Sequence, residues 1–334
     1  MARVRRTLGR QVVRRRDGSK TERRLMFRIL SIDGGGMKGI YAARMLELLV
    51  EQRPDLIKKA NLIAGTSTGS ILALALAAGK TPTELRKLYW REGKNIFNDS
   101  FWDDLVDLGG ATGADYNHKG LRKALKRELG PNLRLRDLKT RVLVPAFDLD
   151  APAKGARPRM WKPKFFHNFP GRGSDGRELV VDVAIRSSSA PTYFPTYQGY
   201  IDGGVVANNP SMSALAQAIS PSGGKQKLTD VQLLSIGTGA EPKYIRGNKD
   251  WGWGQWARPL TSLMISGVMG VADYQVSQLL GDRYLRVNGY LSRGVDLDDT
   301  KDKTLQFLEK AAESHVRKRQ NGKSPAQWLA ANGW

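Results

Sequence analysis

Two short apolar runs each end in a glycine-rich turn, and a helix-forming stretch follows each turn. Residues 26–32, MFRILSI, precede the first turn, and residues 61–64, NLIA, precede the second. Apolar runs of this length bounded by glycine are typical of buried strands. Strand, turn and helix in alternation give a mainly parallel sheet with helices on both faces. This pattern restricts the chain to an α/β fold.

The rest of the chain continues the alternation. Further strands are expected at 141–147 and 230–236, and helices at 40–51, 70–78 and 211–219. The last of these helices has an asparagine and a proline at its start, which favour a helix N-terminus. Surface loops are expected at 171–177 and 220–227, and a charged helix within 301–319.

The chain is strongly basic. Of its 334 residues, 54 are Lys or Arg and 32 are Asp or Glu, which gives a formal net charge of +22. Such a charge attracts polyanions, including nucleic acid and anionic lipid headgroups, or serves solubility alone. Residues 1–24 are expected to be a disordered basic arm. A single domain is expected over 25–334, with its core motifs within 26–240 and a less diagnostic part over 241–334.

Composition excludes several classes of protein. The chain has no cysteine, which excludes disulfides and thiolate metal sites and suits a reducing cytosol. The basic N-terminus lacks the apolar segment of a secretory signal, and the longest apolar stretch, residues 71–78, is too short to span a bilayer. We therefore expect a cytoplasmic protein without a transmembrane segment.

The first glycine-rich turn, DGGGMKG at 33–39, fits more than one known pattern. Its glycines match G-x-G-x-x-G of dinucleotide-binding folds, but those folds expect an acidic residue where the next strand here ends in GTSTG. A Walker phosphate loop is excluded because Leu74 stands where its first glycine is required. The backbone N–H groups of Gly34, Gly35 and Gly36, placed before a helix, suit an oxyanion hole.

The second turn presents one serine between glycines. GTSTG at 65–69 fits G-x-S-x-G, in which small flanking residues permit a tight strand-to-helix turn. Ser67 is expected at the N-terminus of the following helix, whose dipole favours a serine alkoxide. An oxyanion-type turn followed by a serine-presenting turn indicates acyl transfer. Lys38 either adds positive potential to the first turn or faces solvent.

A serine nucleophile needs a base within hydrogen-bond reach. The three histidines, His118, His167 and His315, stand in no glycine-rich turn, and we expect them to be surface or packing residues. Asp202 follows a short apolar strand and precedes two glycines, so its carboxylate can take the serine proton directly. The same Asp-Gly-Gly also fits an ordinary turn.

These motifs resemble, in type and order, those of the patatin-like phospholipases. The resemblance covers about residues 26–240 and is carried by DGGGMKG at 33–39, GTSTG at 65–69, DGG at 202–204, RSSSAPTYFP at 186–195 and LLSIGTG at 233–239. The positions that support the motifs without a direct chemical role are Asp33, Lys38, Gly39, Gly65, Gly69, Gly203 and Gly204.

The resemblance implies a three-layer α/β/α sandwich and a Ser–Asp dyad in place of a triad. It makes Ser67 the nucleophile, Asp202 the general base, and the backbone of Gly34, Gly35 and Gly36 the oxyanion hole. The implied reaction is hydrolysis of phospholipid acyl esters through an acyl-enzyme, with no metal or organic cofactor. The implied partner is membrane phospholipid, through peripheral contact with the inner membrane. A homo-oligomer is a further candidate assembly, although the sequence does not disclose the oligomeric state.

Short bacterial members of the family that open with FRILSIDGGGMKG are similar to effectors of antiphage systems that a cyclic dinucleotide activates. The resemblance therefore also implies a cyclic-dinucleotide activator. Three alternatives stay open at this point: a constitutive patatin-type lipase, an acyltransferase with the same dyad, and a basic nucleic-acid-binding protein.

Two apolar groups near residue 260 have two interpretations each. Trp251, Trp253 and Trp256 either face a membrane or ligand, since tryptophan favours interfaces, or pack in the core against Leu260 and Met264. The second group is expected at buried helix positions, with an acyl-chain channel as the alternative: Met264, Val268, Met269 and Val271.

Overall fold

The structure is a computed structural model, and it describes residues 10–14, 20–24, 26–97, 117–153, 155, 158–247, 250–318 and 323–334. The strands within these ranges are β1 (Arg10–Arg14), β2 (Lys20–Arg24), β3 (Phe27–Ile32), β4 (Leu62–Gly65), β5 (Arg141–Ala151), β6 (Met160–His167), β7 (Tyr200–Asp202), β8 (Val231–Ile236) and β9 (Tyr284–Val287). The α-helices are α1 (Gly39–Gln52), α2 (Leu56–Lys59), α3 (Thr68–Ala78), α4 (Pro82–Phe97), α5 (Lys119–Leu129), α6 (Val180–Ser188), α7 (Gly204–Ala207), α8 (Ser211–Ile219), α9 (Trp253–Leu280), α10 (Asp302–His315) and α11 (Pro325–Ala331).

The described strands from β3 onward form one seven-stranded sheet in the order β6-β5-β4-β3-β8-β9, with β7 also paired to β5. Five of them, β3, β4, β5, β8 and β9, run parallel, whereas β6 and β7 pair antiparallel with β5. In the register of the central strands, Ile32 lies opposite both Gly65 and Ile236. The carboxyl ends of these strands therefore meet at one edge of the sheet, which is where α/β folds place their sites.

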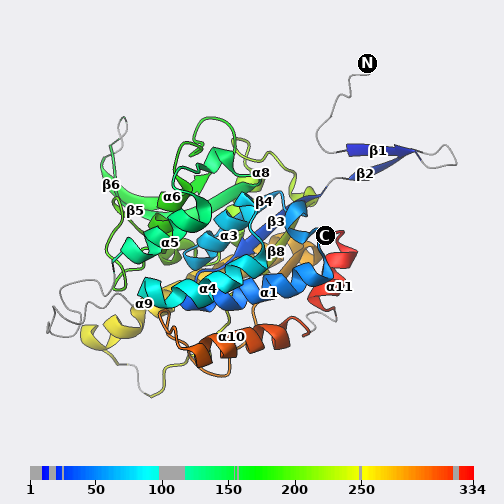
Figure 1. The fold of residues 1–334 in the computed structure, drawn as a ribbon. Coiled ribbons are helices and arrows are strands. Elements are labelled where there is room, and N and C mark those ends of the chain that lie inside the picture. Colours follow the sequence, from blue (N-terminus) through cyan, green and yellow to red (C-terminus); the bar gives the residue numbers. More distant parts are fainter. Residues whose placement is uncertain are drawn as a thin grey trace.

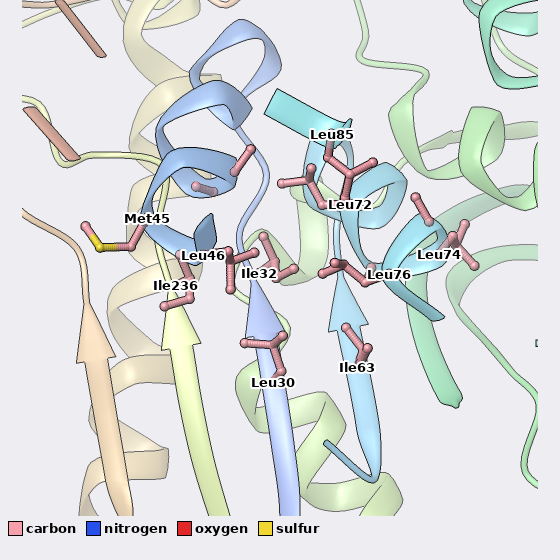
Figure 2. Packing of buried hydrophobic residues seen from close by; sticks show 14 of the residues in the cluster. Leu30, Ile32, Met45, Leu46, Ile63, Leu72, Leu74, Leu76, Leu85 and Ile236 are labelled. Carbon is pink, nitrogen blue, oxygen red and sulfur yellow. The ribbon is translucent and has the colours of Figure 1, made fainter. Parts of the chain in front are cut away.

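Successive side chains along each strand point to opposite faces of the sheet. Each face is covered by helices (Figure 1). On one face, Leu30, Ile63 and Ile236 are fully buried in a cluster that includes α1 and α3 (Figure 2). On the other face, Ile29 and Leu233 are fully buried in a second cluster that includes residues of α8 and α9. A parallel sheet buried on both faces confirms the expected three-layer α/β fold.

The local predictions for the core elements are confirmed. The two strands that precede the glycine-rich turns are β3 and β4, and the helices that follow those turns are α1 and α3. The helix expected at 211–219 is α8, and the side chain of Asn209 accepts a hydrogen bond from the Ser211 amide at its first turn (3.1 Å). The charged helix expected within 301–319 is α10, where the ring of His315 is hydrogen-bonded to the Tyr41 hydroxyl (2.9 Å).

The N-terminal arm differs from the expectation of disorder in two segments. Arg10–Arg14 and Lys20–Arg24 pair as an antiparallel ribbon, with Arg10 opposite Arg24. Alternation in RQVVR and KTERR is short and strongly charged, so the pattern alone did not indicate strands. The other residues of the arm lie outside the described part of the chain.

The expectation of buried positions along α9 is wrong. The side chain of Met264 is 54% exposed and that of Val271 is 55% exposed. Trp251 and Trp256 form an edge-to-face pair, with ring centroids 5.1 Å apart, instead of packing in the core. The side chain of Trp253 lies outside the described ones. None of the described helices is both long enough and apolar enough to cross a membrane.

Candidate active site

Ser67 lies on a strained turn between β4 and α3. Its backbone has φ 54° and ψ −127°, a conformation that residues other than glycine rarely adopt. The turn is tight because Gly65 packs against Gly69: a Cβ at Gly65 would lie 2.0 Å from the carbonyl oxygen of Gly69. A Cβ at Gly69 would in turn lie 2.4 Å from the carbonyl oxygen of Ile32. Both glycines are therefore required by the turn that presents Ser67.

Asp202 lies close to the side chain of Ser67. The Asp202 carboxylate accepts a hydrogen bond from the Gly204 amide (2.6 Å), and the nearby Ser67 hydroxyl also favours its ionised form. Asp202 ends β7, where it lies opposite Ala146 of β5, so the sheet itself holds its backbone. Burial raises the pKa of the carboxyl to about 6, whereas the Ser67 hydroxyl and the Gly204 amide lower it. The structure thus brings together the predicted nucleophile and the predicted base.

The end of α6 and the residue that follows it hold both residues of this pair. The Ser67 amide donates to the Ser187 hydroxyl (3.0 Å), and that hydroxyl donates to the carbonyl oxygen of Pro145 (2.6 Å). The amide of Asp202 donates to the carbonyl oxygen of Ser189 (2.9 Å), and that of Gly203 to the carbonyl oxygen of Ser187 (3.2 Å). The serines of the RSSSAP segment therefore set the relative position of nucleophile and base.

The glycine turn at 33–39 lies beside Ser67. A Cβ added to Gly34 would lie 2.2 Å from the side-chain oxygen of Asn208 and 3.1 Å from the Cβ of Ser67, so a larger residue would have to displace Asn208. The carbonyl oxygen of Gly34 accepts from the Thr238 hydroxyl (2.9 Å), and its amide donates to the carbonyl oxygen of Asn208 (3.0 Å). The expectation named Gly34 among three oxyanion donors, but this hydrogen bond already occupies its N–H group. Asn208 and Thr238 therefore fix the backbone of the turn.

The next two glycines begin a short helical turn. Gly36–Lys38 is a 3-10 helix that leads directly into α1, and within the described residues the Gly35 and Gly36 amides donate to no protein acceptor. The Met37 amide donates to the carbonyl oxygen of Leu297 (2.7 Å), which fixes the end of the turn. Gly39, at the start of α1, packs against the hydroxyls of Tyr89 and Thr68, which are hydrogen-bonded to each other.

Lys38 has neither of the two positions considered for it. Its ammonium group forms an ion pair with Glu241 (2.7 Å), and the side chains are only 12% and 6% exposed. Glu241 also pairs with Lys243 (2.9 Å) and accepts from the Val295 amide (3.3 Å). The charge of Lys38 is therefore compensated, and the residue ties the glycine turn to the segment that follows β8.

Asp33 is held by a cation from the C-terminal part of the chain. Its fully buried carboxylate forms two contacts with the Arg286 guanidinium, at 3.0 and 2.5 Å. Arg286 also donates to the hydroxyl of Ser235 (2.7 Å), on the neighbouring strand β8. A bidentate pair of this kind fixes direction as well as distance, so the pair anchors the start of the glycine turn.

The histidines take no part in the described site. His118 precedes α5 and contacts the Ser189 hydroxyl through Nε2 (3.0 Å), His167 lies on β6, and His315 pairs with Tyr41. Burial lowers the pKa of each of the three rings. No hydrogen bond joins any of them to Ser67 within the described residues, in accord with the expectation that they are packing or surface residues.

Four residues of the site were not identified from the sequence as parts of it: Ser187, Asn208, Thr238 and Arg286. Ser187 and Thr238 stand in two of the segments that carried the family resemblance, RSSSAP and LLSIGTG, but their contacts follow only from the fold. Arg286 occupies a strand whose burial pattern merely alternates. Across the described residues, no group of three or more His, Cys, Asp or Glu is arranged to hold a metal ion.

This combination of a strained serine turn, a buried aspartate and a glycine turn on an α/β sheet is that of a serine acyl hydrolase. Residues 30–215 match the family model described as patatin-like phospholipase. The chain therefore belongs to the patatin-like phospholipase family, a class of ester hydrolases.

Relatives within the family cover most of the chain. It is 36% identical to the protein called Protein teg of Priestia megaterium, over 78% of this chain and 87% of that one. It is 33% identical to a cGAMP-activated phospholipase of Pseudomonas aeruginosa, over 78% of each chain. It is 32% identical to another cGAMP-activated phospholipase, from Escherichia coli, over 84% of this chain and 86% of that one.

Proposed function

We propose that the chain hydrolyses acyl esters of membrane phospholipid with a Ser67–Asp202 dyad. The observation that carries this proposal is the proximity of the Ser67 side chain, on its strained turn, to the buried carboxylate of Asp202, whose pKa it lowers. A carboxylate with a pKa near 6 is ionised at neutral pH and still basic enough to accept a proton. The amides of Gly35 and Gly36 serve as the oxyanion donors, since that of Gly34 is occupied by Asn208.

The first half of the reaction forms an acyl-enzyme. Ser67 Oγ attacks the acyl carbonyl carbon while its proton passes to Asp202, and the carbonyl oxygen becomes an oxyanion that accepts hydrogen bonds from Gly35 and Gly36. When the tetrahedral intermediate collapses, the bond to the leaving lysophospholipid oxygen breaks and Asp202 returns the proton to that oxygen. The acyl group stays on Ser67 Oγ.

The second half releases the fatty acid. A water molecule attacks the acyl-enzyme, Asp202 takes one of its protons, and the second tetrahedral intermediate forms at the same two amides. Its collapse breaks the bond to Ser67 Oγ, which regains the proton from Asp202. The strained backbone of Ser67 keeps its Oγ clear of the helix throughout.

The decisive experiment measures fatty-acid release from vesicles of phosphatidylethanolamine and phosphatidylglycerol. Ser67→Ala and Asp202→Asn are each expected to lose activity by about 1,000-fold or more, because the two residues act as a unit. The matched control is Ser222→Ala, a serine exposed in the loop after α8, which is expected to retain full activity. Release by Ser67→Ala at the rate of the original protein would overturn the proposal.

We further infer that a cyclic dinucleotide activates this phospholipase in antiphage defence, from the cytoplasm and at the inner membrane. Two relatives at 33% and 32% identity, matched over most of their length, are named cGAMP-activated phospholipases, which supports the activator in this inference. Release is measured with and without cGAMP, and an increase of tenfold or more is expected. A thermal-shift measurement of cGAMP binding to Ser67→Ala separates activator binding from catalysis.

Two other outcomes would replace this regulation or this reaction. Equal release with and without cGAMP and other cyclic dinucleotides would make the protein a constitutive lipase. Transfer of the acyl group to an added alcohol or lysophospholipid, in preference to water, would make it an acyltransferase with the same dyad.

A further inference from the structure

We propose that two projections beside the active site form an apolar rim that docks the protein on an anionic phospholipid surface. The apolar rim is defined by exposed side chains of the β5–β6 hairpin, of the segment after β8 and of the first half of α9: Leu149, Met160, Trp161, Tyr244, Leu260, Leu263 and Met264. This inference rests on the proposed phospholipase function, and it names the surface through which substrate reaches Ser67.

The first projection is α9, which is much longer than the strands on which it packs. Its 28 residues span about 42 Å, against about 20 Å for a six-residue strand such as β8. Only its last part packs on the sheet, through the buried Ala272, Val276 and Leu280. Among the described side chains from 251 to 271 none is buried.

The free half of α9 points past the active-site edge. Because α9 ends just before β9, and β9 is parallel to β8, the helix runs from the carboxyl edge of the sheet to the amino edge. Near its middle, the sulfur of Met269 accepts a hydrogen bond from the side chain of Asn208 (2.9 Å), the residue that fixes Gly34. The residues before Met269 therefore extend beyond the site.

The second projection is the β5–β6 hairpin. β5 pairs with β4 only as far as Leu143 but continues to Ala151, and Asp202 lies opposite Ala146. The hairpin therefore extends beyond Asp202 on the same side as the start of α9, and both lie on the left in Figure 1. At its end, Trp161 is 70% exposed and Met160 is 53% exposed.

The composition of the apolar rim favours a lipid surface as its occupant. Residues 251–272 contain one charged residue, the cation Arg258, and a stretch so apolar is unusual on the exposed side of a helix. Exposed cations accompany the apolar side chains. Lys162 follows Trp161, and the guanidinium carbon of Arg246 lies 4.9 Å from the centroid of the Tyr244 ring. Apolar side chains flanked by cations are typical of proteins that lie on an anionic membrane interface.

Net charge argues against a second copy of the chain on this surface. Each copy carries a formal charge of +22, so two copies repel each other, whereas an anionic bilayer attracts them. The two projections also flank the serine site, so a bilayer against both brings acyl esters to the oxyanion turn. A second copy seated there would cover that site.

The test is sedimentation with vesicles of phosphatidylethanolamine and phosphatidylglycerol. Leu263→Asp with Met264→Asp is expected to lower the partition coefficient tenfold or more, because two apolar side chains no longer leave water. The control is Leu279→Asp, since Leu279 is 40% exposed on the same helix but at its opposite end. It is expected to bind within twofold of the original protein, and Trp161→Ser is expected to weaken binding through the other projection.

A soluble short-chain ester separates docking from catalysis. All three variants are expected to hydrolyse it at the original rate, whereas Ser67→Ala is expected to bind vesicles fully and hydrolyse nothing. The original protein could bind vesicles and hydrolyse nothing, while the double variant fails to bind. That result would contradict the phospholipase function and still support the apolar rim as a docking surface.

Three results would overturn the apolar rim. The first is undiminished vesicle binding by the double variant. The second is an equal loss of binding in Leu279→Asp. The third is an original protein that does not bind vesicles but sediments as a dimer, together with a double variant that is monomeric. That result would make this face an interface between copies of the chain.

Discussion

Arg286 and Asp33 form a bidentate ion pair that joins β9 to the start of the glycine turn, across 253 residues of sequence. The Asp33 side chain is fully buried and that of Arg286 is 13% exposed. Removing one member of such a pair leaves an uncompensated buried charge, which costs more than losing the attraction between the two. Arg286 is therefore a positioning residue for the glycine turn.

Arg286→Met is expected to lower the free energy of unfolding by about 3 kcal/mol, because Asp33 remains buried without its partner. Urea denaturation measures this loss. The double variant Asp33→Asn with Arg286→Met is expected to recover much of it, since no charge is then left unpaired. A double variant less stable than Arg286→Met would contradict the pairing as the source of the loss.

The same pair shows where sequence reasoning stops. β3, β4, α1 and α3 follow from local patterns of apolar residues and glycines, so their boundaries and the strained serine turn were predictable. The partner of Asp33 was not, because Arg286 belongs to a strand that merely alternates buried and half-buried residues. Only the pairing of β9 with β8 brings Arg286 beside Ser235 and, through it, to Asp33.

The exposure of α9 was mispredicted for a related reason. A helix with one charged residue in more than twenty is predicted from its composition to be buried. Residues 272–280 do pack on the sheet. Whether the remainder is covered depends on the length of the helix relative to the strands beneath it. The length of a helix relative to the strands that it covers is a property of the tertiary fold. It cannot be predicted from the spacing of apolar residues along the helix.

The pH dependence of hydrolysis is expected to follow Asp202. Its pKa is raised to about 6, chiefly by burial, and only the ionised carboxylate can take the proton of Ser67. kcat/KM on a soluble ester is therefore expected to fall tenfold per pH unit below about 6 and to level off above 7. A midpoint near 4, the ordinary value for an aspartate, would contradict a buried base.

Asp202 is also expected to make stability depend on pH. Because its pKa is raised in the folded protein, from 3.8 to about 6, its favourable contribution is present below pH 4 and is lost as pH rises through 6. Asparagine does not ionise, so Asp202→Asn does not lose stability as the pH rises. At pH 8 its free energy of unfolding is expected to exceed that of the original protein by about 1–3 kcal/mol, seen as a higher unfolding temperature. The difference is expected to vanish near pH 4. An equal difference at both pH values would assign it to packing.

The strain at Ser67 predicts an unusual order of stabilities. With φ at 54°, alanine at this position keeps the strain, whereas glycine adopts the conformation freely. Both variants lack the Ser67 hydroxyl, so catalysis does not enter the comparison. Ser67→Gly is expected to exceed Ser67→Ala by about 1 kcal/mol in the free energy of unfolding, measured by urea denaturation.

The matched control for this order is Ser70, which lies three residues further along the chain, inside α3. Glycine within a helix is less stable than alanine by about 1 kcal/mol, so Ser70→Gly is expected to fall below Ser70→Ala. The two positions should therefore show opposite signs for the same exchange of alanine and glycine. If Ser67→Gly is no more stable than Ser67→Ala, the turn stores no strain, and the serine is held forward by the hydrogen bond of its amide to Ser187 alone.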